Sequence, residues 1–119
     1  NILVAIQALV FNEEPLRNEP GFEESPKKQI NLYSSVIQFA NYKVSIIDQI
    51  NNNLGEYEIF RDTIKDYFKE NIEKYDSLIS KLCKNENVEL NTPAYGMNVY
   101  LDYKNLEKYY ETFKTKILV

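Results

Sequence analysis

The sequence predicts an all-α fold of four main helices, and two observations support this class. In residues 26–51, 57–84 and 101–118, apolar side chains recur at spacings of three or four, which aligns them on one face of an α-helix. Convincing strands are absent, and residues 95–100 are the only weak candidate. The remaining helix is expected over residues 2–10, a run that is apolar on nearly all sides.

For residues 2–10 a β-strand competes with the helix, because the apolar run is short. Its alanine, glutamine and leucine residues favour a helix. Residues 11–24 are expected to form a loop, since two prolines and a glycine interrupt any regular element. This loop carries five acids: Glu13, Glu14, Glu19, Glu23 and Glu24.

The second helix has a sharp expected start, because Ser25 suits the N-cap and Pro26 suits the first helical position. It ends near residues 51–53, and Gly55 can take the left-handed closing conformation. The inward stripe is predicted to be Ile30, Tyr33, Ile37, Ala40, Val44 and Ile47.

The third helical segment, residues 57–84, is either one helix or two with a bend near Asn71. Its apolar stripe is Phe60, Ile64, Phe68, Ile72, Tyr75, Ile79 and Leu82. Residues 85–98 read as a linker, and the last helix covers residues 101–118. That helix is predicted to face inward with Leu106, Tyr110, Phe113 and Ile117. The chain therefore divides into residues 1–84 and an appended linker and helix over residues 85–119.

Composition limits the chemistry that this chain can perform. The 119 residues carry a net charge of −4, one cysteine and no histidine. Lysines are interleaved with acids rather than gathered on a basic face, so nucleic acid is not an expected partner. A single cysteine excludes an internal disulfide and a multi-cysteine zinc site, and no metal or cofactor is expected. No apolar run approaches the roughly 20 residues of a membrane span.

Cys83 is the only candidate nucleophile among the side chains. Lys81 and Lys84 surround it with positive charge, which would lower the thiol pKa. However, the chain holds no histidine to activate the thiol, and a partly buried, inert cysteine is the favoured interpretation. The residues alone therefore indicate a helical domain that is not a self-sufficient enzyme.

Two stretches near the beginning of the chain resemble a known family. Residues 3–10, LVAIQALV, resemble the helix that follows the active site in ubiquitin-conjugating enzymes. The segments Asn12-Glu13-Glu14-Pro15-Leu16 and Asn18-Glu19-Pro20-Gly21-Phe22-Glu23 resemble the N-E-P-G-F/Y-E loop of the very large members, the BRUCE/Apollon-like and hybrid conjugating enzyme–ligase types. Residues 59–68 resemble the later F-x-x-V-I-x-x-H-F pattern without its histidine. The resemblance covers about residues 1–82.

The resemblance implies that the chain is the C-terminal helical part of an α+β ubiquitin-conjugating domain. Such enzymes form a thioester between a cysteine and the C-terminus of ubiquitin and then transfer ubiquitin to a substrate lysine. That cysteine and the H-P-N motif before it precede the matched helix, so they are expected before Asn1, and Cys83 does not correspond to it. The fragment is therefore expected to be inactive by itself.

The resemblance also implies roles for four residues. The outer face of the matched helix, including Val4 and Ala8, would hold the donor ubiquitin in its reactive pose, which contributes through orientation. Glu13 and Glu14 match the position of acids that orient the incoming lysine and favour its neutral form. The implied partners are ubiquitin and a ligase or substrate protein, in the cytoplasm or a host cytoplasm.

A physical consequence follows if the packing partner of the first helix is missing. The apolar side chains of this segment would be exposed, and exposed apolar surface favours self-association. A homo-oligomer is expected through Ile2, Leu3, Ile6, Leu9 and Val10. Two alternatives stay open: a non-enzymatic helical protein-interaction module, and a conjugating-enzyme variant without catalysis that acts as a scaffold.

Overall fold

The computed structural model describes the whole chain, residues 1–119, and it corrects the predicted fold class. The chain is mostly helical, but β1 (Val88–Asn91) and β2 (Asn98–Leu101) form a two-stranded antiparallel sheet, and there are more helical elements than the four expected. The all-α class is therefore wrong, and the fold is an α+β mixture. The sequence analysis did not predict these strands. Each has only four residues, and most of their side chains are exposed, so no clear alternation of apolar and polar residues marks them.

The chain forms two compact units. The first comprises Asn1–Phe39 and Glu89–Leu101, and the second comprises Ala40–Val88 and Asp102–Val119. The predicted division of the chain into residues 1–84 and 85–119 stays a prediction.

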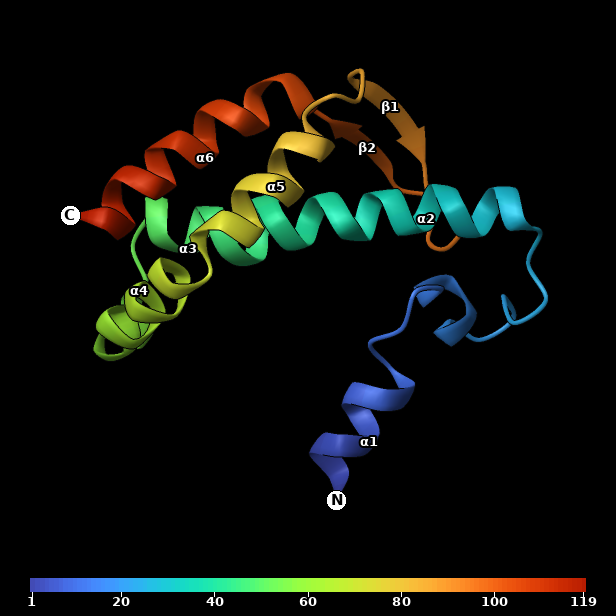
Figure 1. Cartoon of the computed structure of the whole chain (residues 1–119). Coiled ribbons are helices and arrows are strands. Elements are labelled where there is room, and N and C mark those ends of the chain that lie inside the picture. The colour runs from blue at the N-terminus through green and yellow to red at the C-terminus, as the bar shows by residue number, and fades with distance from the viewer. The chain divides into compact units, whose positions relative to one another are not determined.

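The first unit contains α1 (Ile2–Leu9), a 3-10 helix (Pro15–Asn18), most of α2 (Lys27–Ala40) and the β1–β2 hairpin. The helical prediction for the first segment is confirmed, and the Asn1 side chain caps α1 by accepting from the amide of Leu3 at 2.8 Å. Figure 1 shows the hairpin beside the first half of α2 and α1 projecting away from both. The core of this unit consists of Leu16, Ile30, Tyr33 and Ala94, with Phe22 and Ile37 packed against it.

The helical chain after α2 departs from α-helical geometry. A π-helical segment, Asn41–Ile47, leads into the short helix α3 (Asp48–Asn51). A π-helix bonds each residue to the fifth along the chain, so its wider turns shift the phase of the side chains. Val44 was predicted to face inward on an α-helical stripe, but it is 53% exposed, whereas Ile47 and Ile50 are buried.

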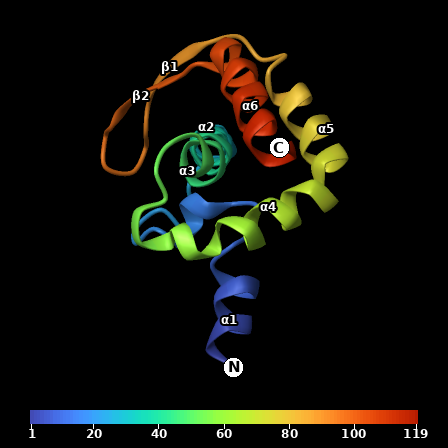
Figure 2. The same cartoon turned by 90° about the vertical axis from the view of Figure 1, so that its left-hand side faces the viewer.

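The second unit places α6 (Tyr103–Leu118) alongside α3, α4 (Arg61–Glu70) and α5 (Ile72–Leu82). Figure 2 shows α5 continuing from α4 through a bend, with α6 next to α5. The bend lies at Asn71, so the predicted segment is two helices, and a 3-10 helix (Gly55–Phe60) precedes them. All four residues predicted to face inward from α6 are buried: Leu106, Tyr110, Phe113 and Ile117.

Aromatic packing organises the core of this second unit. The ring of Phe113 meets that of Phe68 edge-on at 5.1 Å between centroids and stacks on Tyr110 at 5.6 Å. Phe68 also contacts Tyr75 at 4.8 Å. Edge-to-face and offset aromatic pairs add to the burial of apolar area, so these rings join α4, α5 and α6.

Candidate functional site

The helix α1 presents only uncharged side chains, and none of them is buried. Val4, one of the two predicted ubiquitin contacts, is 60% exposed, and Ala8 is exposed as well. Large contiguous apolar patches are uncommon on the surfaces of monomeric proteins, and they occur at interaction sites and at places prone to aggregation. The exposed large apolar residues of this region are Ile2, Leu3, Val4, Ile6, Leu9, Val10 and Phe11.

Two asparagines fix the turn that follows α1. The Asn12 side-chain amide donates to the carbonyl of Leu9 at 3.1 Å and to the Oδ1 atom of Asn18 at 3.2 Å. Asn18 in turn donates to the carbonyl of Val10 at 2.7 Å, and the amide of Glu14 donates to Oδ1 of Asn12 at 2.9 Å. Since the last carbonyls of a helix lack partners within it, these side chains satisfy them and define how the chain leaves α1.

Glu14 lies at the start of the 3-10 helix and is held by two cations. Its Oε1 atom pairs with Lys27 Nζ at 2.5 Å, and its Oε2 atom pairs with Arg17 Nε at 2.5 Å. The hydrogen bonds from Lys27 and then from Arg17 lower the pKa of the Glu14 carboxyl below its ordinary value. Both carboxylate oxygens are therefore committed to contacts within the loop.

Glu13, the neighbouring acid, is arranged differently. It is exposed, and its carboxylate takes part in none of the ion pairs that hold Glu14. Its backbone carbonyl accepts a hydrogen bond from the Ser34 hydroxyl at 3.3 Å, which ties the residue to α2. Of the two predicted orienting acids, Glu13 alone offers an open carboxylate on an anchored backbone.

Sequence reasoning missed the two cations that distinguish these acids. The pairing of Glu14 with Arg17 has a local signal, because opposite charges three residues apart meet on one helical turn. The pairing with Lys27 joins residues 13 positions apart, so only the tertiary structure brings them together.

Cys83 lies at the end of α5, in the second unit, and is partly buried. Burial, followed by the negative charge of Glu107, raises the pKa of its thiol. The thiol is therefore protonated at neutral pH, which agrees with an inert cysteine rather than a nucleophile. No group of three or more histidine, cysteine, aspartate or glutamate side chains in the chain is placed to hold a metal ion.

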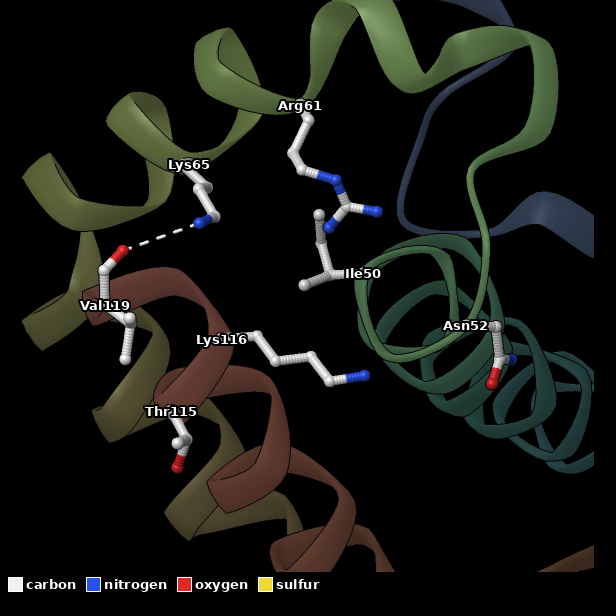
Figure 3. A pocket seen from close by; sticks show the side chains of 7 residues that line it. All are labelled: Ile50, Asn52, Arg61, Lys65, Thr115, Lys116 and Val119. Atoms are coloured by element: carbon white, nitrogen blue, oxygen red, sulfur yellow. Dashed lines mark hydrogen bonds between the residues drawn. The ribbon is translucent and has the colours of Figure 1, made fainter.

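The second unit contains a cavity lined by cations and a separate apolar groove. Figure 3 shows the first, of about 400 Å³, into which Arg61, Lys65 and Lys116 extend. Each of these cations already has an acceptor within the chain: respectively the Glu58 carboxylate, the Val119 carbonyl at 3.5 Å and the Asn51 carbonyl. Their charges are thus partly satisfied without a ligand.

The second cavity is an apolar groove of about 430 Å³, and it holds no charged residue. It is lined by Ser45, Ile46, Gln49, Ile50, Leu54, Tyr57, Phe60, Ile64 and Phe68. Tyr57 and Phe60 are more than half exposed, so this groove is open to an apolar partner.

No protein-family model matches the chain, and a search among curated proteins finds no match either. No helix combines the length and the apolar character needed to cross a membrane.

Proposed function

We propose that the chain is the part of a ubiquitin-conjugating enzyme that follows the catalytic cysteine, and that it helps to transfer ubiquitin from that cysteine to a substrate lysine. The observation that carries the proposal is the exposed, uncharged helix α1, which leads directly into an ordered loop where the Glu13 carboxylate is open. This order of elements accompanies the sequence resemblance of the same residues. Ubiquitin, a ligase and a substrate protein are the proposed partners, in the cytoplasm or a host cytoplasm.

In this proposal α1 supports the donor ubiquitin. Val4 and Ala8 supply an uncharged patch against which ubiquitin packs while its C-terminus is linked to the cysteine. Holding the thioester in one pose removes rotational freedom before attack, which raises the effective concentration of the reacting groups. The exposure of both side chains supports this role because they are accessible to a partner.

Glu13 is the proposed acid for the acceptor lysine, and Glu14 is the proposed scaffold of the loop. A lysine attacks a thioester only as the neutral amine, so a carboxylate at hydrogen-bond distance orients the amine and accepts its proton. The open carboxylate of Glu13 supports this assignment. The two cations on Glu14 keep that residue engaged in the loop instead.

The test uses a polypeptide that extends this chain upstream to the expected H-P-N motif and cysteine. Incubation with ubiquitin-activating enzyme, ATP and ubiquitin should yield a thioester that reductant cleaves. Discharge to free lysine should slow by about tenfold or more in Val4→Asp and Ala8→Asp, because orientation is lost, while thioester formation is unchanged. Thr112→Asp, an exposed change on α6, is the matched control.

The two acids are separated by the same discharge assay. Glu13→Gln should slow discharge by about a hundredfold, the typical contribution of a positioned acid–base group. Glu14→Gln should slow it less, since it acts only through the loop. If Glu13→Gln and Glu14→Gln slow discharge to the same small extent, Glu13 is not the acid that accepts the proton of the lysine.

The second candidate is a non-enzymatic protein-interaction module, and the apolar groove of the second unit favours it. Grooves of this kind accept the apolar face of a partner helix. An extended polypeptide that folds but never forms a thioester would reject the enzyme and leave this module and the non-catalytic scaffold as the alternatives.

A further inference from the structure

Glu19, in the loop after α1, accepts hydrogen bonds from two tyrosines of other elements. The Tyr95 hydroxyl, at the tip of the β1–β2 hairpin, donates to Oε2 of Glu19 at 2.6 Å. The Tyr33 hydroxyl, on α2, donates to Oε1 at 3.3 Å. The Tyr95 contact joins residues 76 positions apart, so the hairpin and the loop are connected by a side-chain contact that no local pattern predicts.

Tyr95 reaches Glu19 from an unfavourable backbone conformation. Its φ is +65°, in the left-handed region that residues with a Cβ atom seldom adopt. Such conformations persist where the surroundings enforce them, and they cluster at functional sites. A second positive φ, +56° at Gly96, follows in the same hairpin turn, so the turn accounts for this backbone conformation. The Tyr95 side chain is 75% exposed, and its hydrogen bond to Glu19 holds it against the loop.

The hairpin tip is held firmly around Tyr95. The buried Thr92 hydroxyl donates to the carbonyl of Ala94 at 2.5 Å and accepts from the amide of Met97 at 2.9 Å. Ala94 is 1% exposed and packs with Leu16, which belongs to the loop that follows α1. The tip therefore contacts this loop twice, through an apolar contact and through a charge-assisted hydrogen bond.

We propose that Tyr95 is a positioning residue: through Glu19, the hairpin tip holds the loop of residues 12–23 so that Glu13 faces the incoming lysine. The link within the loop is short, since Glu19 directly follows Asn18, whose side chain binds Val10 and Asn12 at the end of α1. This inference rests on the proposed function, and it assigns a role to residues 88–101.

The first experiment tests the contact in this chain alone. Hydrogen exchange of the amides in residues 12–23 should accelerate by about three- to tenfold in Tyr95→Phe, since one charge-assisted hydrogen bond is lost from an exposed site. Tyr57→Phe, an equally conservative change at a 63% exposed tyrosine of the second unit, should leave the loop unchanged. Unchanged exchange in Tyr95→Phe would overturn the proposal.

Glu19→Gln provides a second variant that keeps an acceptor for the Tyr95 hydroxyl. The hydrogen bond to Glu19 and then its negative charge raise the pKa of Tyr95. Since Glu19→Gln removes the charge and keeps the hydrogen bond, the pKa of Tyr95 should fall part of the way to its ordinary value, while the loop amides stay as protected from exchange as in the parent. If the loop amides of Glu19→Gln exchange as fast as those of Tyr95→Phe, the hydrogen bond between residues 19 and 95 does not position the loop.

The second experiment tests positioning in the extended polypeptide. Tyr95→Phe should slow discharge of ubiquitin to lysine by about three- to tenfold, matching the loss of loop order, without changing thioester formation. In a Glu13→Gln background the same change should have no further effect, because Tyr95 acts through Glu13. Additive losses would overturn the positioning role. Absence of any thioester in the parent would reject the proposed function, while the exchange result would still report on the contact.

Discussion

Truncation of Leu16 is expected to loosen the loop that carries Glu13. Leu16 is fully buried, in contact with the small cluster that contains Ile30, Tyr33 and Ala94. Leu16→Ala removes three carbon atoms from this cluster, which is about 2.4 kcal/mol of transfer free energy at about 0.8 kcal/mol per carbon. The cavity that remains adds to this, so the free energy of unfolding should fall by about 3 kcal/mol.

Urea denaturation followed by far-ultraviolet circular dichroism measures this loss, and hydrogen exchange locates it. The amides of residues 12–23 should lose protection first, since Leu16 is the buried anchor of that loop. Leu118→Ala makes the same chemical change at a 58% exposed side chain and should cost less than about 0.5 kcal/mol. A cost below about 1 kcal/mol for Leu16→Ala, or uniform loss of protection, would refute the reasoning.

Three further outcomes follow from the structure. Cys83 should react with iodoacetamide more slowly at pH 8 than a free thiol does, because burial raises its pKa, and unfolding in urea should restore the ordinary rate. The lowered pKa of Glu14 stabilises the fold at neutral pH, and this stabilisation should disappear as the pH falls through that pKa; thermal melts of Glu14→Gln should lack this part of the acid dependence. The exposed helix α1 should cause self-association, so light scattering should give an average mass that rises with concentration, and Leu3→Glu with Ile6→Glu should return it to the monomer value.

The helices were the predictable part of this fold. The apolar stripe of α6 follows from residue spacing, which acts within one or two turns. The sequence left one helix or two open for residues 57–84, and the structure decides for two that meet at Asn71. The π-helical segment could not be predicted, because its sequence is compatible with an α-helix. The prediction for Val44 was therefore wrong: an α-helical phase places this residue on the buried stripe, but in the π-helical segment it is exposed.

The sequence indicated the residues of the candidate site but not the contacts that distinguish them. The resemblance of residues 3–10 and 12–23 directed attention to Val4, Ala8, Glu13 and Glu14, and the helical character of α1 is confirmed. It did not distinguish the two acids, because their environments depend on Lys27 and Ser34 from a different element.

The sequence by itself predicted the main helical segments and shows that the chain has no histidine and one cysteine. Local spacing, capping and composition are sufficient for those conclusions, since they involve residues close together in the chain. Only the tertiary structure decided that Glu14 is paired and Glu13 open, and that Tyr95 lies on Glu19. These contacts join residues 13 and 76 positions apart, and such contacts form when packing brings separate elements together.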